Sequence, residues 1–143
     1  MASTQCLPVS FLGELLGGTH DFGVAGDTFY LALYSSSATL NSSTTVYTTT
    51  NEVTGTNYVA GGNALTNQGA STSGTTAYTD FADCVFTNVT ITARYGLIYN
   101  STEANKAVAV LDFGTDKTAT GQTMTIVFPA AGASTAIIQI VEN

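Results

Sequence analysis

Basic side chains are almost absent from this sequence. Arg94, Lys106 and Lys117 are its only Lys or Arg residues, against ten Asp or Glu, so the formal net charge is −7. A nucleic acid needs a cluster of Lys and Arg that displaces counterions from its phosphates, and an anionic membrane surface attracts polybasic segments. We therefore expect neither nucleic acid nor membrane among the partners.

Groups that carry chemistry are scarce as well. The chain has one His, two Cys and no Trp, and only 9% of its residues are charged. Enzymes usually concentrate groups with tunable pKa values around a cleft. The sequence contains no Gly-x-Ser-x-Gly elbow, Walker loop, dinucleotide fingerprint or Cys/His metal cluster. It predicts no catalytic residues, no cofactor and no metal.

One His and two pairs of nearby Asp residues are the local features that would suit a catalytic or metal site. His20 stands beside Asp21, as a general base beside its partner would, but nothing nearby supplies a nucleophile. We interpret His20 as a structural residue of the turn after a helix. The close carboxylates are Asp80 with Asp83 and Asp112 with Asp116. Neither pair has the ligand spacing of an EF-hand, so we interpret all four as turn or surface residues, with a weak surface calcium site as the alternative.

Cysteine and long apolar runs are limited too. Cys6 and Cys84 permit one disulfide, but two reduced thiols, with Cys84 buried as a small hydrophobe, are the simpler interpretation. The first residues lack the basic region of a secretory signal, and no segment reaches the roughly 20 apolar residues of a membrane-spanning helix. These features predict a soluble protein that is made in a cytosol.

The abundant residues are those of β-sheets. Of the 143 residues, 26 are Thr, and 44% are hydrophobic. β-Branched and aromatic residues fit a pleated, half-buried surface. A chain of this length forms about one domain. Many short strands separated by turn signals predict an all-β fold, a single β-sandwich of jelly-roll-like type over residues 23–143.

Alternation of apolar and polar residues locates the strands. Phe29, Leu31 and Leu33 should share one face of the first strand, and Tyr30, Ala32 and Tyr34 the other. In the strand over 87–99 the odd-numbered residues from Val89 to Tyr99 should share a face, and Ile91 and Ile126 should be buried. Strands are predicted at 28–34, 44–51, 57–60, 63–66, 77–86, 87–99, 106–113, 122–128 and 135–141, with loops at 69–74 and 114–121.

The only helical pattern lies near the start of the chain. Phe11, Leu12, Leu15 and Leu16 have the spacing of one apolar stripe. Ser10 is expected to cap the helix, and Gly17-Gly18 to end it. We predict that residues 1–22 form an arm whose stripe lacks partners within its own chain and reaches a neighbouring molecule.

Tyrosines spread over several segments are the second candidate for an interface. A Tyr ring buries a large area and keeps a hydrogen-bonding tip, which is why interfaces are rich in it. An equally weighted alternative is that half of the tyrosines close the ends of the sandwich. The predicted interface residues are Phe11, Leu12, Leu15, Leu16, Tyr30, Tyr34, Tyr47 and Tyr58.

Several segments carry a resemblance to a known class of proteins. They are residues 10–22 (SFLGELLGGTHDF), 27–40 (DTFYLALYSSSATL), 50–58 (TNEVTGTNY), 93–100 (ARYGLIYN) and 107–114 (AVAVLDFG). Together they resemble small structural virion proteins of tailed bacteriophages. The resemblance implies a capsid cement or decoration protein with a β-sandwich body, and it brings no catalytic residues with it.

The expected function follows from composition and resemblance together. We expect a non-enzymatic protein on the capsid surface of the virion that binds the major capsid protein and itself, as a dimer or trimer. One alternative is a head- or tail-fibre module whose Tyr and Asn side chains bind a host glycan. A second alternative is a depolymerase that uses Asp80, Asp83 or Asp112.

Overall fold

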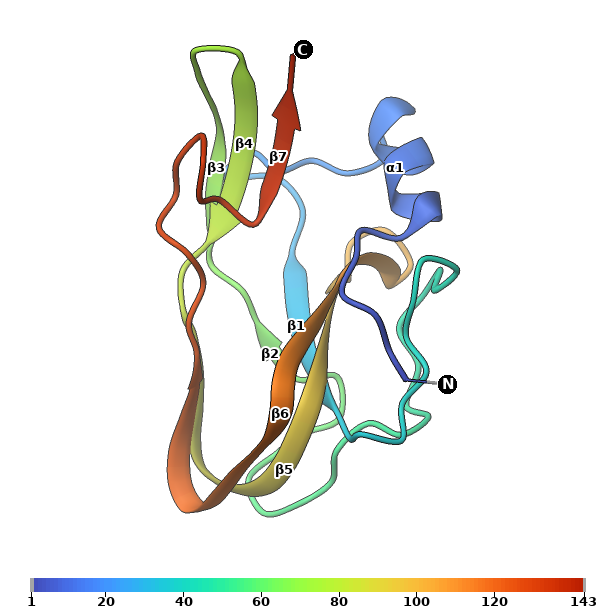
Figure 1. Ribbon diagram of the computed structural model, residues 1–143, viewed down its shortest axis with the longest axis vertical. Coiled ribbons are helices and arrows are strands. Elements are labelled where there is room, and N and C mark those ends of the chain that lie inside the picture. The colour runs from blue at the N-terminus through green and yellow to red at the C-terminus, as the bar shows by residue number, and fades with distance from the viewer. Residues whose placement is uncertain (1, 143) are drawn as a thin grey trace.

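The computed structural model describes residues 2–142 and confirms an all-β chain with one short helix (Figure 1). Its seven strands form two antiparallel sheets, one of four strands in the order β2-β1-β5-β6 and one of three in the order β3-β4-β7. The elements are α1 (Val9–Leu16), β1 (Phe29–Tyr34), β2 (Asn63–Ala64), β3 (Asn67–Ser73), β4 (Thr76–Phe81), β5 (Cys84–Asn100), β6 (Lys106–Ile126) and β7 (Ile138–Val141).

The four-stranded sheet is apolar on both faces. In β1, Phe29, Leu31 and Leu33 belong to the main core, whereas Ala32 and Tyr34 belong to a second core on the opposite face. This is the alternation that the sequence predicts. Because both faces are apolar, both need a cover.

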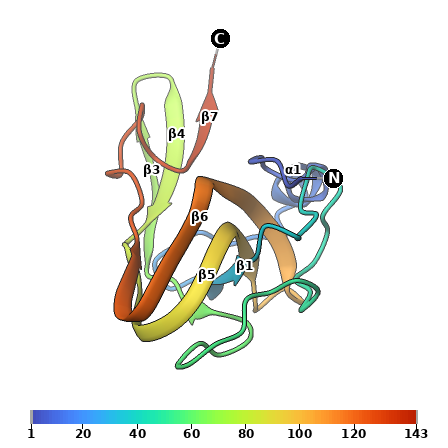
Figure 2. The same ribbon diagram turned by 60° about the horizontal axis from the view of Figure 1, so that its bottom comes forward.

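The long antiparallel pair of β5 and β6 dominates the molecule, and it curves strongly (Figure 2). Its register shifts between Ala93 and Tyr95, where Gly114 in β6 has a φ of +81°. Such irregularities bend a strand. The loop expected over 114–121 is therefore wrong: Gly114 and Gly121 both take positive φ values within one continuous strand.

The same register shift overturns the predicted face of β5. Ala93 lies in the main core as expected, but Tyr95, Leu97 and Tyr99 lie in the second core. Ile98 takes their place in the main core. A strict period of two fails here because the strand pair is irregular at this point, where four residues of β6 (113–116) lie opposite Arg94 alone, and β5 bends from one core to the other.

The three-stranded sheet contains a strand where a loop was expected. Residues 69–74 contribute to β3 and to the turn that joins it to β4, with Gly69 and Gly74 at positive φ. Conversely, the strand predicted over 44–51 is absent, and Val46 forms only an isolated bridge with Lys106. Thr-rich composition alone did not distinguish the two segments.

The main core joins both sheets and the segment before them. Phe22 stacks on Phe29 with 4.6 Å between ring centroids, and Phe81 of β4 packs beside both rings. Phe11 of α1 is fully buried in this same core. The expectation that the apolar stripe lacks partners within its own chain is therefore wrong for Phe11.

The ends of α1 differ from expectation in one respect. Pro8, not Ser10, is the N-cap residue, and the Ser10 hydroxyl is buried inside the helix without a hydrogen-bond partner among the described residues. At the other end Gly18 takes a φ of +75°, and the Thr19 N–H donates to the Glu14 carbonyl at 2.9 Å. Those two features are a Schellman ending, as Gly17-Gly18 predicts.

Residues 35–62 cover the second core without forming a regular strand. Ala38 and Leu40 of this segment are buried against Leu97 and Val110. Near the N-terminus the Ser3 hydroxyl donates to the Ala38 carbonyl and accepts from the Leu40 N–H, at 2.9 and 2.8 Å. Within residues 2–142, no helix has the length and apolar character that crossing a membrane requires.

We predict that two isoleucines expected in the core contribute unequally to stability. Ile91 is buried, as expected, whereas Ile126 is only half-buried beside a cleft, so its expected burial is wrong. Ile91→Ala should cost about 2–5 kcal/mol in the free energy of unfolding. Ile126→Ala should cost clearly less, measured by urea titration. Equal losses would contradict this assignment of the core.

A second prediction concerns the N-terminal segment. Because Phe11 is buried in the main core, Phe11→Ala should lower the free energy of unfolding by about 3–5 kcal/mol. Leu16→Ala, on the exposed side of the same helix, is the matched control and should change it by less than about 0.5 kcal/mol. Similar small effects of both changes would mean that α1 docks too weakly to stabilise the body.

Candidate protein-binding surface

Helix α1 presents an apolar stripe to solvent. Val9, Leu12 and Leu16 are 67%, 44% and 91% exposed, and their spacing places them on one side of the helix. Of the predicted interface residues on this helix, Phe11 is buried and Leu15 is half-buried, so only Leu12 and Leu16 remain on the surface. Val9 completes the stripe and was missed because it precedes the predicted cap.

The helix is fixed to the sheet by a buried polar network. The Asn100 amide Nδ2 donates to His20 Nδ1 at 3.0 Å, which leaves His20 Nε2 to donate to the Glu14 carboxylate at 2.8 Å. Lys106 Nζ binds the other oxygen of Glu14 at 3.1 Å. These bonds join α1 to β5 and β6, so the exposed stripe stands on a rigid support.

This network confirms the structural role predicted for His20. Its side chain is fully buried, and its partners are Glu14 and Asn100 rather than the neighbouring Asp21. Burial raises the pKa of the Glu14 carboxyl, but hydrogen bonds from His20 and Lys106 outweigh that effect and hold it below its ordinary value. Glu14 is therefore a charged anchor for the helix.

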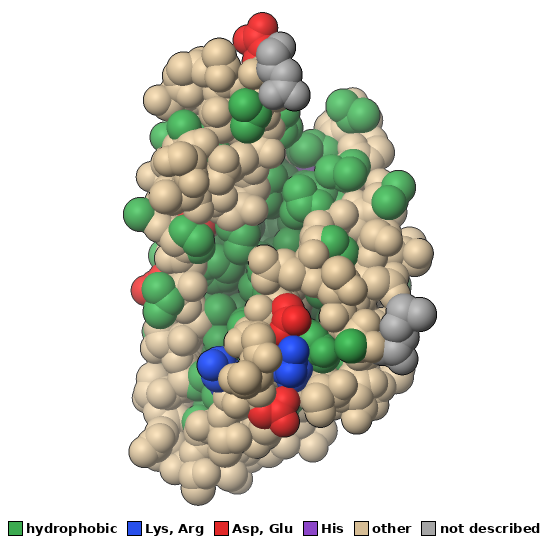
Figure 3. Space-filling view, viewed as in Figure 1, with side chains coloured by type: hydrophobic (Ala, Val, Ile, Leu, Met, Phe, Trp, Pro, Cys, Tyr) green, Lys and Arg blue, Asp and Glu red, His purple; other side chains and the backbone are tan. Residues whose placement is uncertain are grey.

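A hydrophobic hollow opens beside α1. A small apolar groove of about 110 Å³ lies between Leu15 of the helix and Ile138 and Ile140 of β7. A larger cleft of about 740 Å³ follows β6 and the connection from Pro129 to Ile137. Figure 3 shows hydrophobic side chains lining a hollow between the lobe of β3, β4 and β7 and the rest of the molecule.

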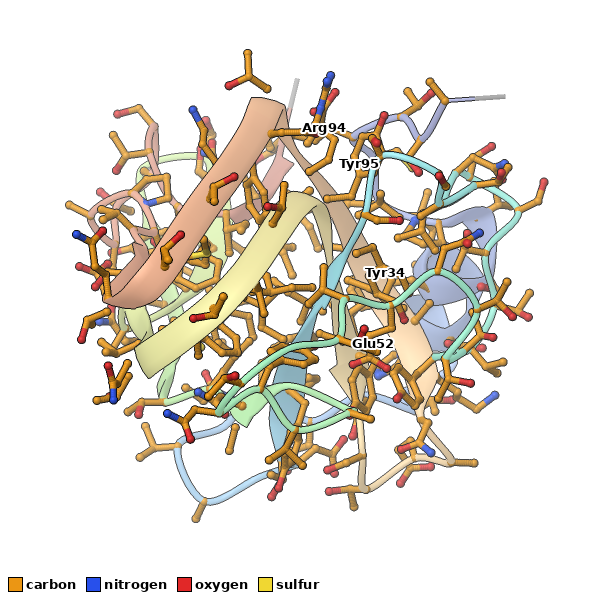
Figure 4. All side chains as sticks on the ribbon, turned by 90° about the horizontal axis from the view of Figure 1, so that it is seen from below. Tyr34, Glu52, Arg94 and Tyr95 are labelled. Atoms are coloured by element: carbon orange, nitrogen blue, oxygen red, sulfur yellow. The ribbon has the colours of Figure 1, made fainter. Side chains whose placement is uncertain are left out.

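The tyrosines predicted for the interface mostly serve the interior. Glu52 is the common partner of two of them: it accepts hydrogen bonds from the hydroxyls of Tyr47 and Tyr58 at 2.6 and 2.7 Å. It also accepts from the Gly61 N–H at 2.7 Å. Tyr34 lies beside Glu52 (Figure 4) and donates to the Thr48 carbonyl at 2.6 Å. We call Glu52 together with Tyr34, Tyr47, Tyr58 and Tyr99, the four tyrosines that its charge affects, the Glu52 cluster.

The exposure expected for these side chains is corrected accordingly. Tyr34 is fully buried, and Tyr30, Tyr47 and Tyr58 are half-buried. Tyr30 and Tyr47 both stack on Tyr99, with centroid distances of 5.8 and 4.7 Å. Rings bound by their own chain hold residues 35–62 in place, which sequence alone could not distinguish from rings that await a partner.

Burial and the negative charge of Glu52 change the acidity of the cluster. Burial is the largest cause, and together with Glu52 it raises the pKa of Tyr34, Tyr47 and Tyr58 well above the ordinary value of tyrosine. The same two causes raise the pKa of Tyr99 to about 12. All four hydroxyls therefore remain neutral donors at physiological pH.

Three of the four paired aspartates, Asp80, Asp83 and Asp112, accept hydrogen bonds within the chain. Asp83 accepts from the Phe128 N–H at 2.9 Å, and Asp112 accepts from Arg94 Nε at 2.9 Å, which lowers the pKa of Asp112. Asp80 is fully buried in β4, and burial raises its pKa, so its interpretation as a turn or surface residue is wrong. Among residues 2–142, no three His, Cys, Asp or Glu side chains gather as a metal site.

Neither the two cysteines nor Arg94 is part of a reactive cluster among the described residues. Cys6 and Cys84 are free thiols, and burial raises the pKa of Cys84 to about 11, as befits the small buried hydrophobe predicted. The Arg94 guanidinium lies over the ring of Tyr95, 5.2 Å from its centroid (Figure 4). With Asp112 on its other side, Arg94 is a paired charge at the bend of β5.

Comparison with known proteins adds no relative. The chain matches no protein-family model, no curated protein and no solved structure. The resemblance to virion proteins of tailed phages therefore stays a prediction. The exposed stripe of α1 and the apolar cleft are therefore the features that bear on function.

We predict that the Glu52 cluster makes the protein sensitive to alkali. An unfolded tyrosine ionises near pH 10. The clustered tyrosines hold their protons to higher pH, so above that pH the folded state binds more protons than the unfolded state. The contribution of these tyrosines to the free energy of unfolding should therefore be constant below about pH 9, and the free energy of unfolding should fall from about pH 10 upward.

Urea titrations at a series of pH values test this, with Glu52→Gln as the comparison. The substitution removes the charge that contributes to the raised pKa values, so its alkaline loss of stability should be shallower. Identical slopes in the two proteins would show that the loss comes from other groups, such as the Cys84 thiol, whose pKa burial also raises.

Proposed function

We propose that this protein is a non-enzymatic structural component of a tailed-phage virion. It binds the outside of the capsid shell as a homo-oligomer and stabilises the shell by bridging subunits of the major capsid protein. We further propose that its two sheets form a sandwich of jelly-roll-like type around their shared core. The resemblance of the sequence supplies the biological setting, and the surface supplies the physical argument.

The exposed stripe of α1 is the observation that carries this proposal. Exposure of these three aliphatic side chains to water is unfavourable. Burying them against a partner is favourable by about 25 cal/mol per Å² of apolar surface. The bonds of Glu14 and His20 keep the helix in place before binding. A preorganised contact loses little conformational entropy on association.

Charge supports a shell protein with a basic surface as the partner. Arg94 is paired with Asp112 and Lys106 with Glu14, which leaves Lys117 as the single basic side chain in residues 2–142 without an ion pair. The remaining charge is negative. A modest contact of this kind holds firmly when it is repeated over a symmetric shell, because linked contacts add avidity.

Copy number on purified particles tests the proposal. A stained gel gives the ratio of this protein to the major capsid protein. Hundreds of copies for each particle are expected of a shell component. A few copies would overturn the proposal in favour of the fibre module, and cleavage of host polysaccharide by the purified protein would favour the depolymerase.

A variant of α1 links the surface to the function. Leu16→Glu should leave the fold intact because the side chain is 91% exposed, and it should weaken binding to empty shells by about tenfold or more. Val59→Glu, at a position 73% exposed within residues 35–62, is the matched control. Sedimentation of shells with each variant measures the bound fraction. Equal loss in both variants would point to charge alone, and no loss in Leu16→Glu would remove α1 from the contact.

A further inference from the structure

The outer edge of β6 is paired over only part of its length. Sheet order places β6 at the edge, with β5 on its inner side. Near its start, Ala107 bonds the Thr45 carbonyl at 2.9 Å, and Val110 exchanges two backbone bonds with Cys6 at 2.9 and 3.1 Å. The Asp112 N–H donates to the Gln5 side chain at 3.1 Å. That is the last partner on this edge.

Beyond the bend the edge is unprotected. Over residues 117–126, β6 pairs with β5 alone, and within the described chain no other strand or bridge reaches it. Ten residues of strand span about 33 Å. An unpaired edge of that length presents a row of backbone donors and acceptors, which most proteins cover or interrupt with charges. Here only Lys117 is charged.

The large cleft runs along this same edge. Met124 and Ile126 line it from β6, Phe128 follows them, and Ala136 and Ile137 line it from the opposite side. These five side chains are apolar, and the cleft holds about 740 Å³. Met124, Ile126 and Phe128 alternate, so their spacing matches the period of a neighbouring strand.

Charge decides which kind of strand fits. Asp112 and Lys117 line the cleft, and Asp112 is already bound by Arg94. Acids flank both ends of the free edge: Asp116 directly precedes it, and Asp83 accepts from the backbone N–H of residue 128 just beyond it. The protein as a whole carries a net charge of −7. A second copy on this edge would add another −7, whereas a segment with basic ends would be attracted.

We propose that residues 117–126 of β6 accept an extended segment of another protein as an added strand. The segment pairs with the free backbone edge, places alternate apolar side chains in the cleft and carries basic residues at its ends. This is recognition by strand addition, in which main-chain bonds give affinity and side-chain pockets give specificity. The identity of the donor rests on the proposed function, under which it is a segment of the shell protein.

Synthetic peptides test the edge without any shell. The probe is a fluorescent peptide in which valine and threonine alternate, with a pair of lysines at each end and a length matched to residues 117–126. Fluorescence anisotropy should show binding to the full chain. A peptide with glutamates in place of the lysines should bind at least about tenfold more weakly, and one with alternate backbone N-methyl groups should not bind.

Two protein variants locate the site. Met124→Arg places a charge at the cleft and should abolish binding of the lysine peptide. Val85→Arg carries the same charge on β5, opposite Thr125 and outside the cleft lining, and should bind as the unmodified protein does. Thermal unfolding checks that both are folded. If Met124→Arg does not fold, hydrogen exchange of the unmodified protein decides, since bound peptide must protect amides within 117–126.

The outcomes separate this inference from the proposed function. Equal binding of the lysine and N-methyl peptides, loss of binding in Val85→Arg, absence of protection over 117–126, or no binding at all would each overturn strand addition. A protein that decorates shells but fails these tests keeps the proposed function and loses the β6 site. If the protein binds the peptide but does not bind shells, strand addition at β6 is supported and the proposed shell function is overturned.

Discussion

A four-stranded sheet that is apolar on both faces is the constraint on which the rest of the structure depends. Residues of β1 alternate between two cores, with Leu31 and Leu33 on one side and Ala32 and Tyr34 on the other. Water must be excluded from both faces, because burial of apolar area is the main favourable term in folding. The chain meets this need in two different ways. The second sheet and α1 cover one face, and residues 35–62 cover the other.

Each cover is fixed by a buried polar hub. On the side of α1, Glu14 binds His20 and Lys106, while Asn100 completes the chain of bonds. On the opposite side, Glu52 accepts from two tyrosine hydroxyls and a backbone N–H. Buried polar groups stabilise a fold only when their bonds are satisfied. Both hubs use scarce charges to position irregular segments that strand pairing does not hold.

The surface left over is what a partner would meet. The main core is not fully covered along β6. After the bend of the β5–β6 pair at Arg94, the outer edge of β6 has no neighbouring strand among the described residues. A cleft and a free edge result there, and the stripe of Val9, Leu12 and Leu16 on α1 is also exposed. Because only 9% of the residues are charged, few charged side chains surround these apolar features.

The sequence by itself determined the all-β class, the helix with its glycine ending and the faces of β1. Each depends on neighbours close in the chain, through a period of two or of 3.6 and through local turn chemistry. Only the tertiary structure decided that residues 114–121 continue a strand, that β5 changes faces after Ala93, and that Phe11 and Tyr34 are buried. Bulges, burial and hydrogen bonds such as those of Glu52 join residues far apart in sequence, and no local period encodes which distant group will be the partner.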